Sequence, residues 1–177
     1  SGATPHGVPD TAGVTESLAQ DTLTAQFNEI DSISIHFDEY PDSIACVIVE
    51  PVAGNMGVVP PEDEFLEGLR ETTTGRGVLL IFDEIIMGFR IALEGAQRIY
   101  GVTPDLTCFG KIVGGGMPVG AYGGREDIMN VVSPLGPMYQ ADTLSDNPVA
   151  MAAGIESIHR LQQSSAYEQL EENAALL

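Results

Sequence analysis

The chain has 177 residues, of which 44% are hydrophobic and 19% charged, with 20 glycines and 11 prolines. This composition is typical of one globular domain and excludes a disordered chain and a collagen-like repeat. The 26 acidic and 7 basic residues give a formal net charge of −19, which argues against nucleic acids and anionic membranes as partners. The same acidic excess suits a high-salt environment, because salt screens the repulsion between like charges.

Two cysteines, Cys46 and Cys108, lie within apolar runs, and their spacing matches neither a CxxC motif nor a metal site. No apolar stretch reaches the about 20 residues that cross a bilayer, and no basic segment precedes an apolar one as in a secretion signal. These features predict a cytoplasmic protein with two buried, reduced thiols.

Residues 1–43 predict a loop or connector, because Gly, Pro, Ser, Thr and Asp are frequent in them. From there the pattern becomes that of alternating strands and helices. Residues 44–50 and 78–83 are continuous apolar runs, typical of strands buried on both faces of a parallel sheet. A helix opened by Pro60 and running to about residue 74 lies between them, so we expect a βαβ unit.

Beyond this unit the expected elements are shorter, apart from the last. The sequence predicts a helix near residues 93–100, strands over 105–109 and 119–122, a helix over 125–132 and a loop over 133–147. The strand over 119–122 is expected to run antiparallel. A long helix begins at Pro148, and its apolar face is expected to lie in the core: Met151, Ile155, Ile158 and Leu161. The predicted fold class is α/β, with a mostly parallel sheet flanked by helices.

Ionisable residues stand at the carboxyl ends of three predicted strands: Glu50, Asp83 and Lys111. Ligands of parallel α/β sheets bind at this edge. Lys111 is the only lysine and lies among apolar and glycine residues, where a desolvated amine can form an imine. The residues alone leave three interpretations open: a structural lysine that pairs with Asp83, a carboxylate that holds a protonated cofactor ring, and an Mg²⁺ site that includes Glu84.

A specific resemblance rests on residues 78–90, VLLIFDEIIMGFR, and on Lys111 within GKIVGGGMPVGAYGG. Further matching segments are VEPVAGN at 49–55, GVTPDLT at 101–107, GPMYQA at 136–141 and TLS at 143–145. In these residues the chain resembles the class III aminotransferases, a family of pyridoxal-phosphate enzymes with a fold-type I large domain. Within the family it is most similar to the aminomutases that convert glutamate 1-semialdehyde into 5-aminolevulinate.

Carried over residue by residue, the resemblance implies that five residues of this chain contact pyridoxal 5'-phosphate. Lys111 would bind the cofactor covalently and move protons during the reaction. Asp83 would hold the protonated pyridine nitrogen, Ile85 would pack against one face of the ring, and Asn55 would hydrogen-bond the 3'-hydroxyl. Thr143 would reach the phosphate of the cofactor in the other subunit of a homodimer, so that each active site would be built from two chains.

The resemblance also implies a division of the chain. Residues 1–43, with Ser1, would be part of the active-site lid and a connector. Residues 44–147 would be the central part of the cofactor-binding large domain, and residues 148–177 a long helix that leads toward a carboxyl-terminal domain. The family's phosphate-binding segment would lie outside this chain, so we expect the chain alone to be incomplete for catalysis.

The implied reaction is an intramolecular amino exchange in tetrapyrrole biosynthesis, which uses the pyridoxamine 5'-phosphate form of the cofactor. The alternatives are a class III ω-aminotransferase with a separate keto-acid substrate and a degenerate fragment without activity. Three residues depart from the family pattern: Met87, where Thr is usual, and Asp142 and Asp146, where Gly is usual. Because Asp142 would place a negative charge beside the cofactor phosphate, Asp142→Gly is expected to tighten cofactor binding.

Overall fold

One four-stranded sheet organises the protein. The computed structural model describes residues 13–163 and 165–176, so Ser1 lies outside the described residues. The strands are β1 (Cys46–Val49), β2 (Leu79–Asp83), β3 (Leu106–Phe109) and β4 (Ala121–Gly124), in that order across the sheet. β1, β2 and β3 run parallel and β4 is antiparallel to β3. The predicted mostly parallel sheet with one antiparallel strand is therefore confirmed.

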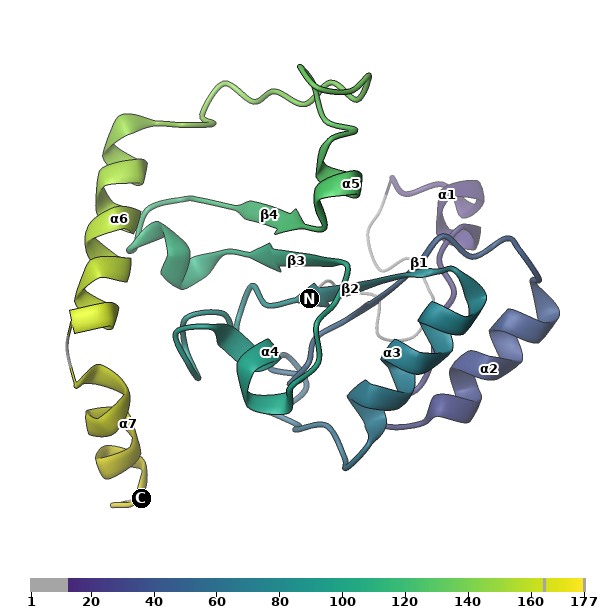
Figure 1. Cartoon of the computed structure of the whole chain (residues 1–177), viewed down its shortest axis with the longest axis horizontal. Helices are drawn as coiled ribbons and strands as arrows, with labels where there is room; N and C mark the ends of the chain where they lie inside the picture. Colours follow the sequence, from purple (N-terminus) through teal and green to yellow (C-terminus); the bar gives the residue numbers. More distant parts are fainter. Residues whose placement is uncertain (1–12, 164, 177) are drawn as a thin grey trace.

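Helices flank this sheet. They are α1 (Glu16–Gln20), α2 (Ile30–Glu39), α3 (Phe65–Arg76), α4 (Gly95–Tyr100), α5 (Glu126–Met129), α6 (Pro148–Gln163) and α7 (Ala166–Ala174), with a 3₁₀ turn, η1 (Lys111–Gly114), after β3. Figure 1 shows α2 and α3 side by side, and α6 at the other end of the molecule, beside η1. Within the described ranges no helix is long and apolar enough to cross a bilayer.

The main core lies between α3, α2 and β2. The side chains that α3 and β2 contribute to it are at most 4% exposed: Phe65, Leu66, Leu69, Leu80 and Phe82. Burial of each stabilises the fold by about 1.5–3 kcal/mol relative to an exposed position. Gly77 ends α3 with a left-handed φ of 68°, which glycine adopts without a steric cost. The predicted βαβ unit is confirmed, although α3 begins four residues after Pro61 rather than at the prolines.

Two expectations for the amino-terminal half are wrong. The segment predicted as a loop, residues 1–43, contains α1 and α2, and α2 contributes Ile33 and Phe37 to the core. β1 is not buried on both faces, since Ile48 is 60% exposed and Cys46 is exposed. Val47 and Val49 pack against the core, whereas Cys46 and Ile48 alternate with them and point to the other face of β1, which no described helix covers closely.

The carboxyl-terminal part also differs from the prediction. The single helix expected over residues 148–177 is two helices, α6 and α7, and α5 covers only half of its expected range. The face of α6 expected in the core is half-buried at best, with Ile155 57% exposed, whereas the buried residues are Ala150 and Gly154. α6 packs closely on the backbone of η1, where a Cβ at Gly154 would lie 2.5 Å from the carbonyl oxygen of Val113. Small residues, rather than large apolar ones, therefore make this contact.

Candidate functional site

Asp83 and Lys111 both lie at the carboxyl edge of the sheet. Asp83 ends β2 and is 5% exposed, and its Oδ1 accepts the backbone N–H of Ile85 at 3.0 Å. In the register of β2 and β3, Asp83 lies beside Cys108, and Lys111 follows three residues later at the start of η1. The carboxyl ends of these two parallel strands are therefore neighbours at one edge of the sheet.

The backbone at Lys111 is unusual. Its φ is +48°, a left-handed conformation that side chains other than glycine and asparagine rarely adopt. The preceding residue, Gly110, lies against Ile85, because a Cβ there would be 3.1 Å from Ile85 Cγ2. Lys111 itself is exposed to solvent. The expected desolvated amine is therefore wrong for this chain by itself, since desolvation needs further groups packed over the lysine.

A cavity of about 950 Å³ lies beside this edge. Its lining includes Glu50, Asn55 and Asp83, together with the segment 20–27 that precedes α2. Glu50 Oε2 accepts the backbone N–H of Gly54 at 3.0 Å, which fixes the turn that carries Asn55. The cavity thus brings three sequence-predicted residues together, whereas Ile85, Lys111 and Thr143 are not part of its lining.

Glu84 points away from this cavity. Its side chain is fully buried, Oε2 accepts the N–H of Ala96 at 2.8 Å, and Oε1 accepts the Nε2–H of Gln97 at 3.2 Å. The three carboxylates considered for Mg²⁺ therefore do not converge. Among the residues that the structure describes, no group of three or more His, Cys, Asp and Glu side chains could hold a metal ion.

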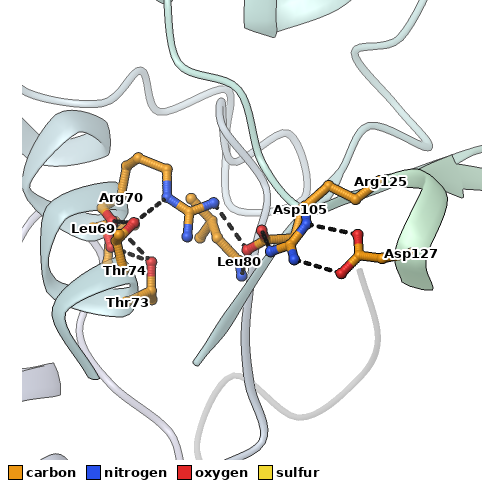
Figure 2. A network of polar contacts seen from close by, with 8 residues as sticks. All are labelled: Leu69, Arg70, Thr73, Thr74, Leu80, Asp105, Arg125 and Asp127. Carbon is orange, nitrogen blue, oxygen red and sulfur yellow. Dashed lines mark hydrogen bonds and ion pairs between the residues drawn. The ribbon is translucent and has the colours of Figure 1, made fainter. Parts of the chain in front are cut away.

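A third buried carboxylate, Asp105, lies at the opposite, amino end of β2 and β3, and no motif in the sequence indicated it. Its oxygens accept the Leu80 N–H at 2.7 Å and bonds from Nη1 of Arg70 at 2.9 Å and of Arg125 at 2.8 Å. Figure 2 shows the two guanidinium groups reaching Asp105 from opposite sides, with Asp127 on the outer flank of Arg125. This network ties α3, β2, β3 and the start of α5 together.

The electrostatics of Asp105 reflect these partners. Burial raises its pKa, but the hydrogen bond from Leu80 and the two guanidinium groups outweigh that effect and hold the pKa below its ordinary value. Asp105 is therefore a structural anion, held in its charged form by cations from distant parts of the sequence.

The two cysteines differ from each other. Both are free thiols, but Cys46 is exposed on β1, so the prediction of two buried thiols is wrong for Cys46. At Cys108, partial burial and the nearby charge of Asp83 raise the pKa of the thiol. Because a raised pKa lowers the fraction of reactive thiolate, we expect Cys108 to react slowly.

Thr143 lies apart from the cavity, in the loop before α6, and is exposed. The neighbouring Asp142 accepts the Leu144 N–H through Oδ1 at 3.4 Å. The same loop carries large apolar side chains in water, with Leu135 76% and Tyr139 82% exposed. Within one chain this loop does not contribute to the candidate site.

Comparison with known proteins then identifies the family. The sequence profile described as aminotransferase class-III matches residues 5–177. The chain belongs to the class-III aminotransferases. Two similar members are named glutamate-1-semialdehyde 2,1-aminomutase: one from Brevibacillus brevis, 55% identical over the whole chain, and one from Natranaerobius thermophilus, 57% identical over 97% of it. The chain spans 41% and 40% of the lengths of these two class-III proteins.

Solved structures of transaminases have the same fold. An omega-transaminase from Sphaerobacter thermophilus is 40% identical, with a TM-score of 0.81 over 86% of this chain and 35% of that chain. A second structure, described as a transaminase with PLP bound, is 33% identical, with a TM-score of 0.84 over 93% of this chain and 40% of that chain. The α/β fold predicted from the sequence is thereby confirmed.

Proposed function

We propose that the whole protein is a pyridoxal-phosphate-dependent aminomutase that converts glutamate 1-semialdehyde into 5-aminolevulinate, a step of porphyrin biosynthesis. This chain supplies the central part of its cofactor-binding domain. The observation that carries the proposal is the identity of 55% and 57% to proteins named for this aminomutase, over 100% and 97% of the chain. The arrangement of Asp83 and Lys111 at one edge of the sheet supports it.

The residues at this edge fit such a cofactor. When bound, pyridoxal phosphate supplies a protonated ring that withdraws electrons from the carbon atoms beside the amino group. Asp83 would hold the proton on the ring nitrogen, because a carboxylate only 5% exposed interacts strongly with a cation. Ile85 offers an apolar surface for one ring face, and Asn55 an amide for the ring hydroxyl.

Lys111 would hold the cofactor covalently and then act as the base and acid at the substrate. Once released from the cofactor, its amine would move protons at the two substrate carbons between which the amino group is exchanged, because each half of the exchange needs a proton transfer at one of them. The left-handed backbone at Lys111 sets the direction of its Cα–Cβ bond. The preceding residue, Gly110, lies against the side chain of Ile85. The segment 20–27, which lines the cavity, belongs to the part proposed as lid and connector.

We extend the proposal to a homodimer with shared active sites, in the cytoplasm. Thr143 would contact the cofactor phosphate of the partner. Its loop exposes Leu135, Tyr139 and Leu144 by 76%, 82% and 63%, and such apolar side chains favour burial against a second copy. The free, exposed thiol of Cys46 favours a reducing compartment.

The first test is a titration of the purified chain with pyridoxal phosphate, followed by absorbance, beside the variant Lys111→Ala. We expect a band shifted to longer wavelength than that of the free cofactor, absent in the variant. Lys111→Arg is the matched control, because it keeps the charge but has no primary amine. A band of equal size in either variant would contradict the role of Lys111.

A class III ω-aminotransferase is the second candidate, favoured by the 40% identity to the omega-transaminase structure. The two reactions differ in their need for a second substrate. An aminomutase forms 5-aminolevulinate from glutamate 1-semialdehyde alone, whereas an ω-aminotransferase needs a keto acid to accept the amino group. Product formed by the whole protein only after a keto acid is added would favour the second candidate.

A further inference from the structure

Glu84 is a fully buried carboxylate with no part in the proposed chemistry, although it directly follows Asp83. A carboxylate removed from water destabilises a protein unless hydrogen bonds compensate for the lost hydration. An apolar side chain would fill the same place without that cost. The contacts of Glu84 therefore call for an explanation.

The side chain of Glu84 connects β2 to α4. Its Oε2 accepts the Ala96 N–H at 2.8 Å, and its Oε1 accepts the Nε2–H of Gln97 at 3.2 Å. Gln97 Nε2 also donates to Oγ1 of Thr107 at 3.0 Å. Thr107 is the β3 residue paired with Phe82, which directly precedes Asp83. Hydrogen bonds thus link Glu84, at the end of β2, to α4 and α4 to β3. The pairing of β3 with β2 completes a closed loop of contacts around Asp83.

The backbone of Glu84 is held as firmly as its side chain. Its N–H donates to the carbonyl oxygen of Cys108 at 3.0 Å, and its own carbonyl oxygen accepts the Gly88 N–H at 2.8 Å. The first residue of α4, Gly95, has a φ of +71°, and a Cβ there would lie 2.2 Å from Oε2 of Glu84. A glycine at this point lets α4 approach closely enough for the Ala96 bond to form.

We propose that Glu84 is a positioning residue for Asp83. By anchoring the turn after β2 to α4 and β3, it fixes the backbone in which the Ile85 N–H reaches Oδ1 of Asp83 at 3.0 Å. It thereby sets the direction of the Asp83 carboxylate and of the Ile85 side chain without touching a ligand. What Asp83 then holds rests on the proposed function, but the ordering of the turn is a property of the chain itself.

Amide hydrogen exchange in the cofactor-free chain tests this ordering. The variants are Glu84→Ala, which removes both bonds, and Glu84→Gln, which keeps one oxygen acceptor in the same shape. Leu66→Ala is the control, because Leu66 on α3 is 1% exposed in the main core and its truncation also destabilises the fold. We expect the amides of Ile85 and Gly88 to exchange about tenfold faster in Glu84→Ala than in the control, with Glu84→Gln between them.

A titration with pyridoxal phosphate adds the functional readout. We expect the dissociation constant of pyridoxal phosphate to rise about tenfold in Glu84→Ala. In Glu84→Gln it should return most of the way to the wild-type value, and in Leu66→Ala it should change little. Equal exchange rates at Ile85 and Gly88 in Glu84→Ala and Leu66→Ala would overturn the inference. A wild-type chain without the Lys111-dependent band would contradict the proposed function instead, and the exchange rates would still decide the role of Glu84.

Discussion

Replacement of Asp105 by asparagine tests the ionic network at the amino end of the sheet. The carboxylate of Asp105 is 4% exposed and accepts bonds from Leu80, Arg70 and Arg125. Asparagine has the same shape, but its NH₂ group replaces one of the two acceptor oxygens. This NH₂ would face an N–H donor of Leu80, Arg70 or Arg125. The least costly orientation turns this NH₂ toward Arg125, because that side chain is 52% exposed and can be hydrated. Arg70 and Leu80 then share a neutral acceptor.

The expected loss of stability follows from these contacts. A hydrogen bond to a charged group stabilises a protein by about 1.5–3 kcal/mol, and breaking a buried ion pair costs about 3–5 kcal/mol. Because Asp105→Asn keeps a neutral acceptor, the loss should lie at the lower end of the range for a broken ion pair. We therefore expect the free energy of unfolding to fall by about 3 kcal/mol. For a chain of this size, that loss lowers Tm by about 6–12 °C.

The pH dependence separates the charge of Asp105 from its shape. Its folded-state pKa lies below the ordinary value of 3.8. A carboxylate with a lowered folded pKa stabilises the protein at every pH above the unfolded pKa, and this contribution is lost as pH falls through the folded pKa. The difference between wild type and Asp105→Asn should therefore be complete at neutral pH and shrink below about pH 4.

Urea unfolding from pH 7 down to pH 3 at constant ionic strength measures this difference. The matched control is Asp127→Asn, since Asp127 bonds Arg125 from the surface and is 65% exposed. We expect the control to leave the unfolding midpoint unchanged. A loss in Asp105→Asn no larger than in the control, or a loss independent of pH down to pH 3, would refute the reasoning.

Three further experiments test other features of the structure. Gly95 and Gly101 have similar φ values of 71° and 68°, but only at Gly95 would a Cβ meet other atoms, those of a buried carboxylate. In denaturant titrations Gly101→Ala should therefore cost about 1–2 kcal/mol and Gly95→Ala about 1–3 kcal/mol more. Gly154→Ala should cost about 1–3 kcal/mol, because its Cβ would lie 2.5 Å from a carbonyl oxygen of η1; no loss would contradict the close contact. With an aromatic disulfide reagent, Cys46 should react about tenfold faster than Cys108, and Cys46→Ser should remove the fast phase.

The sheet and its carboxyl edge could be predicted because their signals are local. Runs of apolar residues over 78–83 and 105–109 determine strands, and a helix between two such runs makes neighbouring strands parallel. Once the strands are parallel, the residues that follow them meet at one edge. The convergence of Asp83 and Lys111 follows from this rule without knowledge of any contact between side chains.

The errors arose where burial depends on what else packs nearby. β1 has the same apolar pattern as β2, but only the face that carries Val47 and Val49 packs against the core, and Ile48 on the other face is 60% exposed. The Asp105 network joins residues 35 and 20 positions apart in the chain, so no local pattern indicates it. Glu84 was considered beside Asp83 as a metal ligand, although neighbouring side chains on a strand end point in opposite directions. That alternation was the one signal that could have placed Glu84 away from the cavity.

The positions of Asp105 and Asp83 explain how short strands can hold a site in place. β2 has five residues and spans about 17 Å, with the Asp105 contacts near its first residues and Asp83 as its last. The Asp105 network clamps β2 and β3 at one end, and the Glu84 contacts clamp the same strands at the other. Strands fixed at both ends cannot slide or tilt independently, so the spacing between Asp83 and the start of η1 is set by the sheet itself. Both clamps use a buried carboxylate because its two oxygens bond several elements at once, which an apolar side chain cannot do.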